Sequence, residues 1–204
     1  LMKAEHLVVF VEEPSMAAAL ESLLPKIIGA LSFQIIQFQC KDDLVKKLPD
    51  RLRGYRWMPE NWAILVLVDR DDDDCVALKT TLEQAATTAG FVTKTCANKG
   101  QSFQVINRIV VEELESWFFG DWTATRKAYP RLPETVPQKE QFRNPDAISG
   151  GTWEALERLL QRAGYFATGL RKIECARAIA GSMDAENNTS HSFTVFASAL
   201  KEIA

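Results

Sequence analysis

The sequence predicts an α/β fold, with a mostly parallel sheet flanked by helices and a helical C-terminal extension after it. Over residues 1–120, short aliphatic or β-branched runs alternate with stretches of helical spacing. This alternation is typical of parallel sheets with a helix on each crossover. Beyond residue 120 the chain is first punctuated by prolines and then contains only helical patterns. We therefore expect a core over residues 1–120 and, over residues 121–204, a loop and helical extension packed on that core.

Each expected element follows from its apolar spacing and its flanking residues. Strands are expected where aliphatic and β-branched residues run together, at residues 6–11, 33–39, 63–68 and 104–111, with a weaker strand at 91–96. Helices are expected where apolar residues recur every three or four positions, at residues 15–30, 42–52, 76–89, 112–119, 153–163, 170–180 and about 192–203. Gly90 is an expected C-cap, and Thr152 and Ser190 are expected N-caps.

A run of acids directly follows the most aliphatic strand. Residues 63–68 predict a strand buried on both faces, and the next six residues are Asp69-Arg70-Asp71-Asp72-Asp73-Asp74. The run therefore lies at the carboxyl end of a central strand, where open α/β sheets bind ligands. Carboxylates crowded there repel one another, and a hard cation such as Mg²⁺, Mn²⁺ or Ca²⁺ would offset the repulsion. The alternative is a solvated helix N-terminus, where Asp is favoured by capping and by the helix dipole.

Acids also follow two other expected strands. Glu12 and Glu13 end the first strand, and Glu112, Glu113 and Glu115 follow the strand at residues 104–111. Because the carboxyl ends of parallel strands meet at one edge of a sheet, these side chains are expected to converge with the Asp run. Such a group predicts metal-dependent phosphoryl transfer, in which carboxylates hold cations and one acid or base moves a proton. For the last three acids, the preference of acids for helix starts is the alternative.

Other acidic motifs fail when their residues are counted. An EF-hand loop starting at Asp69 needs Gly in place of Asp74 and Glu in place of Thr80. A response-regulator receiver with Asp69 as phosphoacceptor matches the Glu12-Glu13 pair but not the second acid at Asp71, and it is kept as a third hypothesis. With two histidines and four cysteines, none spaced as CxxC, no zinc site is expected. Acid–base chemistry then falls to carboxylates or lysines.

Charge is unevenly distributed along the chain. The net charge is −3, yet residues 122–177 contain ten Lys and Arg against six Asp and Glu, a balance of +4 that leaves −7 for the remainder. A basic extension beside an acidic core suits nucleic acid as a partner, although ordinary surface variation is the alternative. Arg171 and Lys172, near a helix start, are candidates for binding a substrate phosphate, or are simply exposed.

The apolar segments are too short for a membrane span, and the chain shows no signal peptide. The run at residues 7–11 is soon interrupted by Glu12, Glu13 and Pro14. Together with the lack of a paired cysteine motif, this predicts a reduced, cytoplasmic protein with no membrane partner.

The acids fall in a pattern that resembles the Toprim fold of topoisomerases, primases and the old-family nucleases. That motif is a Glu after the first strand and Asp-x-Asp after the third, which Glu12, Asp69 and Asp71 match. Nearly the whole chain looks like a Toprim-like bacterial family, domain of unknown function 4276. The segments that resemble it are VEEPSMAAALESLLP, VLVDRDDDDC, RIVVEELESWFFGD, GGTWEALERLLQRAGY, TGLRKIECARAIAGSMD and NNTSHSFTVF. Glu13 departs from the family pattern, in which many members have Gly after the Glu.

The resemblance implies roles for these residues. Glu12 would be the general acid or base, and Asp69 and Asp71 would bind Mg²⁺ or Mn²⁺. Asp73 would contribute through a water molecule. Glu113 and Glu115 fall on acids of the family's third motif and complete the set of candidate metal ligands.

The implied function is a Mg²⁺-dependent nuclease or phosphoryl-transfer protein acting on nucleic acid. By analogy with related proteins, it would act in a phage-defence system beside a partner ATPase. The alternative is a non-catalytic Toprim-like adaptor or sensor that binds such an ATPase.

Overall fold

The computed structural model describes residues 3–204 and contains a sheet of four parallel strands in the order β2-β1-β3-β4. The strands are β1 (His6–Val11), β2 (Ser32–Gln37), β3 (Trp62–Asp69) and β4 (Val105–Val110). The register sets Val11 of β1 beside Leu67 of β3, two residues before β3 ends. The first residue after β1, Glu12, therefore reaches the same sheet edge as Asp69.

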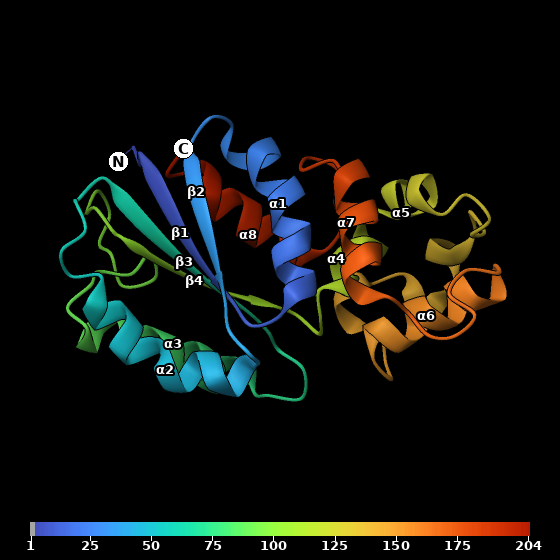
Figure 1. Cartoon of the computed structure of the whole chain (residues 1–204), viewed down its shortest axis with the longest axis horizontal. Helices are drawn as coiled ribbons and strands as arrows, with labels where there is room; N and C mark the ends of the chain where they lie inside the picture. The colour runs from blue at the N-terminus through green and yellow to red at the C-terminus, as the bar shows by residue number, and fades with distance from the viewer. Residues whose placement is uncertain (1–2) are drawn as a thin grey trace.

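Alternate residues of the central strands enter two separate hydrophobic cores, because successive strand side chains point to opposite faces. Leu7, Val9 and Val11 belong to the first core, and Val8 and Phe10 to the second. Helices α1 (Pro14–Ile28) and α8 (His191–Lys201) cover the first face of the sheet, and α2 (Lys41–Gly54) and α3 (Cys75–Thr88) cover the second (Figure 1).

The other helices lie beyond the carboxyl ends of the strands, on the right of Figure 1. They are α4 (Glu115–Gly120), α5 (Trp122–Ala128), α6 (Thr152–Arg162) and α7 (Lys172–Ser182). Three short 3-10 turns connect α5 to α6, namely η1 (Val136–Gln138), η2 (Glu140–Phe142) and η3 (Pro145–Ala147). Helix α7 packs along α1, and Trp117 of α4 contacts the rings of Phe193 and Phe196 at 5.1 and 4.8 Å between centroids. The acidic edge of the sheet thus faces α4, α6 and α7.

The expected α/β class, with a parallel sheet flanked by helices, is confirmed. The strand expected at residues 91–96 is wrong: Thr93 forms an isolated bridge with Val105, and the chain then turns as Cys96 and Ala97 donate back to the Thr93 carbonyl. The loop expected from residue 121 to residue 150 is only partly correct, because it contains α5 and the three 3-10 turns.

Two expectations about helix starts are also wrong. The helix expected from residue 112 begins at Glu115, since Glu112 has a φ of 65° that no right-handed helix accommodates. Thr152 is the first residue of α6 and Gly151 is its N-cap, whereas Ser190 caps α8 as predicted by accepting from the Phe193 N–H. Within residues 3–204, no helix combines the length and the apolar character needed to cross a membrane.

Candidate functional site

Glu12 and Asp69 form a buried carboxylate pair at the ends of β1 and β3. The Asp69 backbone N–H donates to Glu12 Oε1, and each residue is 6% exposed. The Asp69 Oδ1 atom is buried with no hydrogen-bond partner in the described part of the chain. Burial raises the pKa of Glu12 to about 7. Burial, reinforced by the charge of Glu12, raises the pKa of Asp69 well above its ordinary value. The pair therefore needs a proton or a cation to be stable in this position.

Lys41, the first residue of α2, neutralises the outer part of the acidic run. Its Nζ lies 2.6 Å from Asp71 Oδ2 and 2.7 Å from Asp73 Oδ2, and it donates to the carbonyl oxygens of Asp69 and Arg70 at 3.3 and 3.0 Å. Burial alone would lower the pKa of Lys41, but the hydrogen bonds to the two aspartates raise it. The sequence prediction missed this residue. The available signal was a lysine directly after the β2 strand, which ends at the same sheet edge as the Asp run.

The loops after β3 and β4 hold each other in unusual backbone conformations. Asp71 and Glu112 have φ values of 49° and 65°, and the Asp71 N–H donates to the Glu112 carbonyl at 3.0 Å. Arg70 forms an ion pair with the Glu112 side chain. Left-handed backbone at non-glycine residues is costly and is often found at functional sites. These contacts fix the direction of the Asp71 carboxylate.

Glu113 points away from the buried pair and caps a helix. Its Oε2 accepts from the Thr152 N–H, the Thr152 hydroxyl and the Trp153 N–H at 2.9, 2.8 and 3.0 Å. These are free donors at the start of α6, where a carboxylate is also favoured by the helix dipole. The structure therefore gives Glu113 a structural partner, and it does not bring this residue together with Asp69 as the sequence led us to expect.

Glu115 and Lys172 form the inner side of the site. Glu115 is 3% exposed, and burial raises its pKa to about 8. Burial alone would lower the pKa of Lys172, at the start of α7, but the charges of Glu115 and Glu13 raise it. The Lys172 Nζ lies 4.7 Å from the centre of the Trp153 ring.

Arg171, the second predicted phosphate ligand, differs from Lys172 in its surroundings. Its side chain is 69% exposed and pairs with Glu174 at 3.2 Å. Lys172 thus lies near the acids, and Arg171 lies on the surface.

A pocket of about 700 Å³ opens beside the Asp run. Its acidic lining residues are Asp71, Asp72, Glu112, Glu113 and Glu154, and its opposite wall is formed by residues 147–151. No lysine or arginine lines it. An acidic pocket of this kind attracts cations and repels phosphate groups.

The donor atoms suit a hard divalent cation, because all of them are carboxylate oxygens and Asp69 Oδ1 is unpartnered. As the side chains stand, no group of three or more His, Cys, Asp and Glu in residues 3–204 is arranged to hold an ion. Lys41 engages Asp71 and Asp73, and Glu113 caps α6. Glu12 and Asp69 therefore fit a cation directly, while Asp71 and Asp73 fit one once Lys41 releases them.

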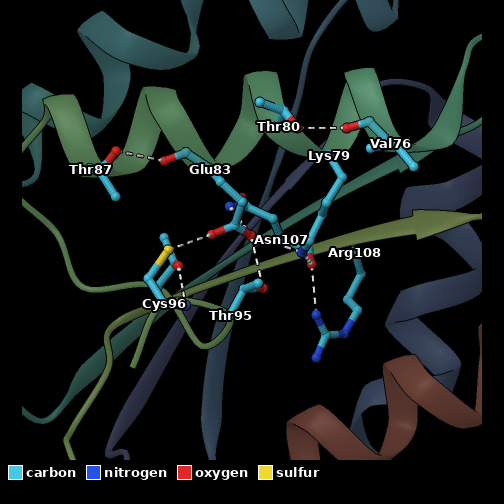
Figure 2. Close-up of polar contacts among 10 residues, drawn as sticks. Val76, Lys79, Thr80, Glu83, Thr87, Thr95, Cys96, Asn107 and Arg108 are labelled. Carbon is cyan, nitrogen blue, oxygen red and sulfur yellow. Dashed lines mark hydrogen bonds and ion pairs between the residues drawn. The ribbon is translucent and has the colours of Figure 1, made fainter. Parts of the chain in front are cut away.

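A second polar cluster lies between α3 and the edge strand β4 (Figure 2). Glu83 accepts from Asn107 Nδ2 at 3.1 Å and from the Thr95 hydroxyl at 3.1 Å. The Asn107 backbone carbonyl accepts from Lys79 at 2.6 Å and from Arg108 at 2.8 Å. These cations occupy a carbonyl of the outermost strand, which protects a sheet edge from pairing with other chains. The cluster lies on the helix-covered side of the sheet and has a structural explanation.

Fold and site together define an α/β protein with a buried carboxylate pair at the carboxyl edge of a parallel sheet. The model of a family described as a domain of unknown function (DUF4276) matches residues 11–201, and the chain belongs to this family. No curated protein matches the chain significantly.

Two solved structures are similar to the chain over almost its whole length. The C-terminal region of the Burkholderia pseudomallei OLD protein is 16% identical, with a TM-score of 0.50 over 97% of this chain and 98% of that chain. The C-terminal region of the Xanthomonas campestris pv. campestris OLD protein is 14% identical, with a TM-score of 0.49 over 99% and 96%. The likeness to the first of these concerns architecture, and at that level the predicted Toprim-like α/β fold class is confirmed.

Proposed function

We propose that the protein is a Mg²⁺-dependent phosphoryl-transfer enzyme of the Toprim type, a nuclease that cleaves nucleic acid. The observation that carries the proposal is the buried Glu12–Asp69 pair with its unpartnered Oδ1 atom, placed where two central strands end. Two carboxylates in that position are unstable without a compensating positive charge. The architecture shared with OLD C-terminal regions is consistent with this assignment.

Asp69 and Asp71 would hold the cation, with Asp73 beside them. When bound, Mg²⁺ would supply Lewis-acid stabilisation of the phosphoryl oxygens. Glu12 would move the proton, because a carboxyl group whose pKa is about 7 can both accept and donate near neutral pH. Lys172 would bind a phosphate of the substrate, since it is the cation nearest Glu115 and it lies against the Trp153 ring.

A single-turnover assay with a labelled oligonucleotide and Mg²⁺ or Mn²⁺ tests the proposal. Glu12→Gln and Asp69→Asn should each lower the cleavage rate by about 100-fold or more, the usual effect of removing a proton-transfer group or a metal ligand. Asp72→Asn is the matched control, because Asp72 is exposed and makes no ion pair within residues 3–204. Wild-type rates in the first two variants would rule the assignment out.

A non-catalytic adaptor that binds a partner ATPase is the second candidate. It is favoured by Lys41, which already neutralises Asp71 and Asp73 without any metal. An adaptor predicts no rise in melting temperature with Mg²⁺ or Ca²⁺, whereas a cation that binds the native state must raise it. The role in phage defence and the cytoplasmic location stay predictions.

A further inference from the structure

A second pocket, of about 430 Å³, lies between η2, η3 and α6, and its charge is opposite to that of the acidic pocket. Three cations line it, Lys139, Arg158 and Arg162, against one acid, Glu140. Arg158 and Arg162 are four residues apart on α6 and therefore share one face of the helix. All three basic side chains are exposed.

The three cations are not neutralised by the rest of the protein. Within residues 3–204, none of them forms an ion pair, whereas Arg126 pairs with Glu134 and Arg171 pairs with Glu174. A cluster of unpaired cations around a concave surface is a binding site for anions. Free guanidinium groups are suited to phosphate because they donate two parallel hydrogen bonds to its oxygens.

The floor of this basic pocket is apolar and fixed. Phe142, Ala155 and Leu159 line it and are buried. The Phe142 ring stacks on the Phe119 ring at 5.2 Å between centroids, with 13° between the planes. A charged rim around an apolar floor matches a nucleotide unit, which has an anionic phosphate and a flat, apolar base.

The basic pocket and the acidic pocket share a wall. Ala147, Ile148 and Ser149 line both of them. A ligand that reaches from one pocket to the other therefore meets carboxylates on one side of this wall and cations on the other. A nucleic acid strand fits this order, because a phosphate bridged to the acids by a cation is followed along the strand by phosphates that need direct positive charge.

We propose that the basic pocket binds the phosphodiester backbone of a nucleic acid strand next to the phosphate held at the acidic site. The proposal rests on the proposed function for its choice of ligand. It adds Lys139, Arg158 and Arg162, which had no assigned role, as substrate-binding residues.

The test is fluorescence anisotropy with a labelled single-stranded oligonucleotide in Ca²⁺ and, separately, in EDTA. Arg158→Glu/Arg162→Glu should weaken binding by about 10-fold or more and reduce the slope of log affinity against log salt by about two, one for each lost phosphate contact. Lys46→Glu/Lys99→Glu is the control with the same charge change, because both lysines are exposed and lie away from the two pockets. It should change the affinity by less than about 2-fold.

The outcomes separate this inference from the proposed function. If the wild type binds and cleaves the oligonucleotide but the Arg158/Arg162 variant binds as well as the control, the inference is wrong and the nuclease assignment stands. If the variant loses binding but no protein cleaves, the pocket is supported and the nuclease assignment fails. Inorganic phosphate that displaces the oligonucleotide at the pocket as effectively as unlabelled strand would assign a small anion instead. Arg162→Glu alone, at the exposed end of α6, should lose about half of the effect on log affinity and keeps the test usable should the double variant fold poorly.

Discussion

At the residue scale, the carboxylate of Asp69 occupies a position that disfavours its charge. It is 6% exposed, one of its oxygens is unpartnered, and Glu12, Glu13 and Glu115 all raise its pKa after burial itself. Only its neighbourhood with Glu12 was predictable, because a parallel register fixes which strand ends meet. The roles of Lys41 and Glu113 were not predictable, because each depends on contacts with residues about thirty or forty positions away that leave no local pattern.

Replacement of Lys41 tests whether its ammonium group competes with a metal. Lys41→Met should increase the affinity for Mn²⁺ by about 10-fold, because Asp71 and Asp73 then lose their resident positive charge. The cost in stability without metal should stay near 1 kcal/mol, since both aspartates are about half exposed.

Electron paramagnetic resonance of free Mn²⁺ measures the affinity of this variant. Lys47→Met, which removes the surface pair with Asp43 on the same helix, is the control and should bind Mn²⁺ like the wild type. Equal affinities in the two variants would show that Lys41 does not occupy a cation position.

The pKa of Glu115 predicts a dependence of stability on pH. The folded value of about 8 lies above the ordinary carboxyl value of about 4.3, so the native state holds a proton that the unfolded chain releases between these values. The free energy of unfolding should therefore fall as the pH rises from about 4.5 to about 8, by at most about 1.4 kcal/mol per pH unit for this group. Glu115→Gln should remove this share of the slope.

Urea denaturation at several pH values between about 5 and 8 measures that slope. The control is Glu174→Gln, whose exposed carboxyl lies on α7. A profile for Glu115→Gln that runs parallel to the wild type would contradict a raised pKa at this position.

At the scale of elements, the strands were the most predictable part of the protein. Central strands such as β3 are aliphatic on both faces, because α1 and α8 cover one face and α2 and α3 the other. The segment at residues 91–96 misled the prediction, because its β-branched composition resembles a strand while only Thr93 pairs with β4. The start of α6 was also misjudged, since its cap comes from Glu113 in another element.

The cap on α6 predicts how Glu113 contributes. Glu113→Ala should lower the free energy of unfolding by about 1–2 kcal/mol, since three donors at the helix start lose their acceptor. Its affinity for Mn²⁺ should remain that of the wild type. Urea denaturation and Mn²⁺ titration of the same variant separate the two roles. Unchanged stability combined with lost Mn²⁺ binding would make Glu113 a metal ligand, as the sequence pattern suggested.

At the scale of the whole molecule, charge is separated along the face beyond the strand ends. The acidic pocket and the basic pocket share the segment at residues 147–149. The excess of Lys and Arg in residues 122–177 indicated a basic extension but not where its charges would gather. Composition contains no information about which cations are already paired, and Arg126 and Arg171 prove to be paired while Arg158 and Arg162 are not.

The most direct test of the central claim, that Asp69 belongs to a divalent cation site, is the melting temperature of Asp69→Asn with and without Mg²⁺ at about pH 8. Without metal, the variant should melt a few degrees above the wild type, because a buried repulsive charge is removed. Saturating Mg²⁺ should raise the melting temperature of the wild type, by about 2.7 kcal/mol of stabilisation at a hundredfold excess over Kd, and leave that of the variant unchanged. An equal Mg²⁺ effect on both proteins, or none on the wild type, would contradict the account.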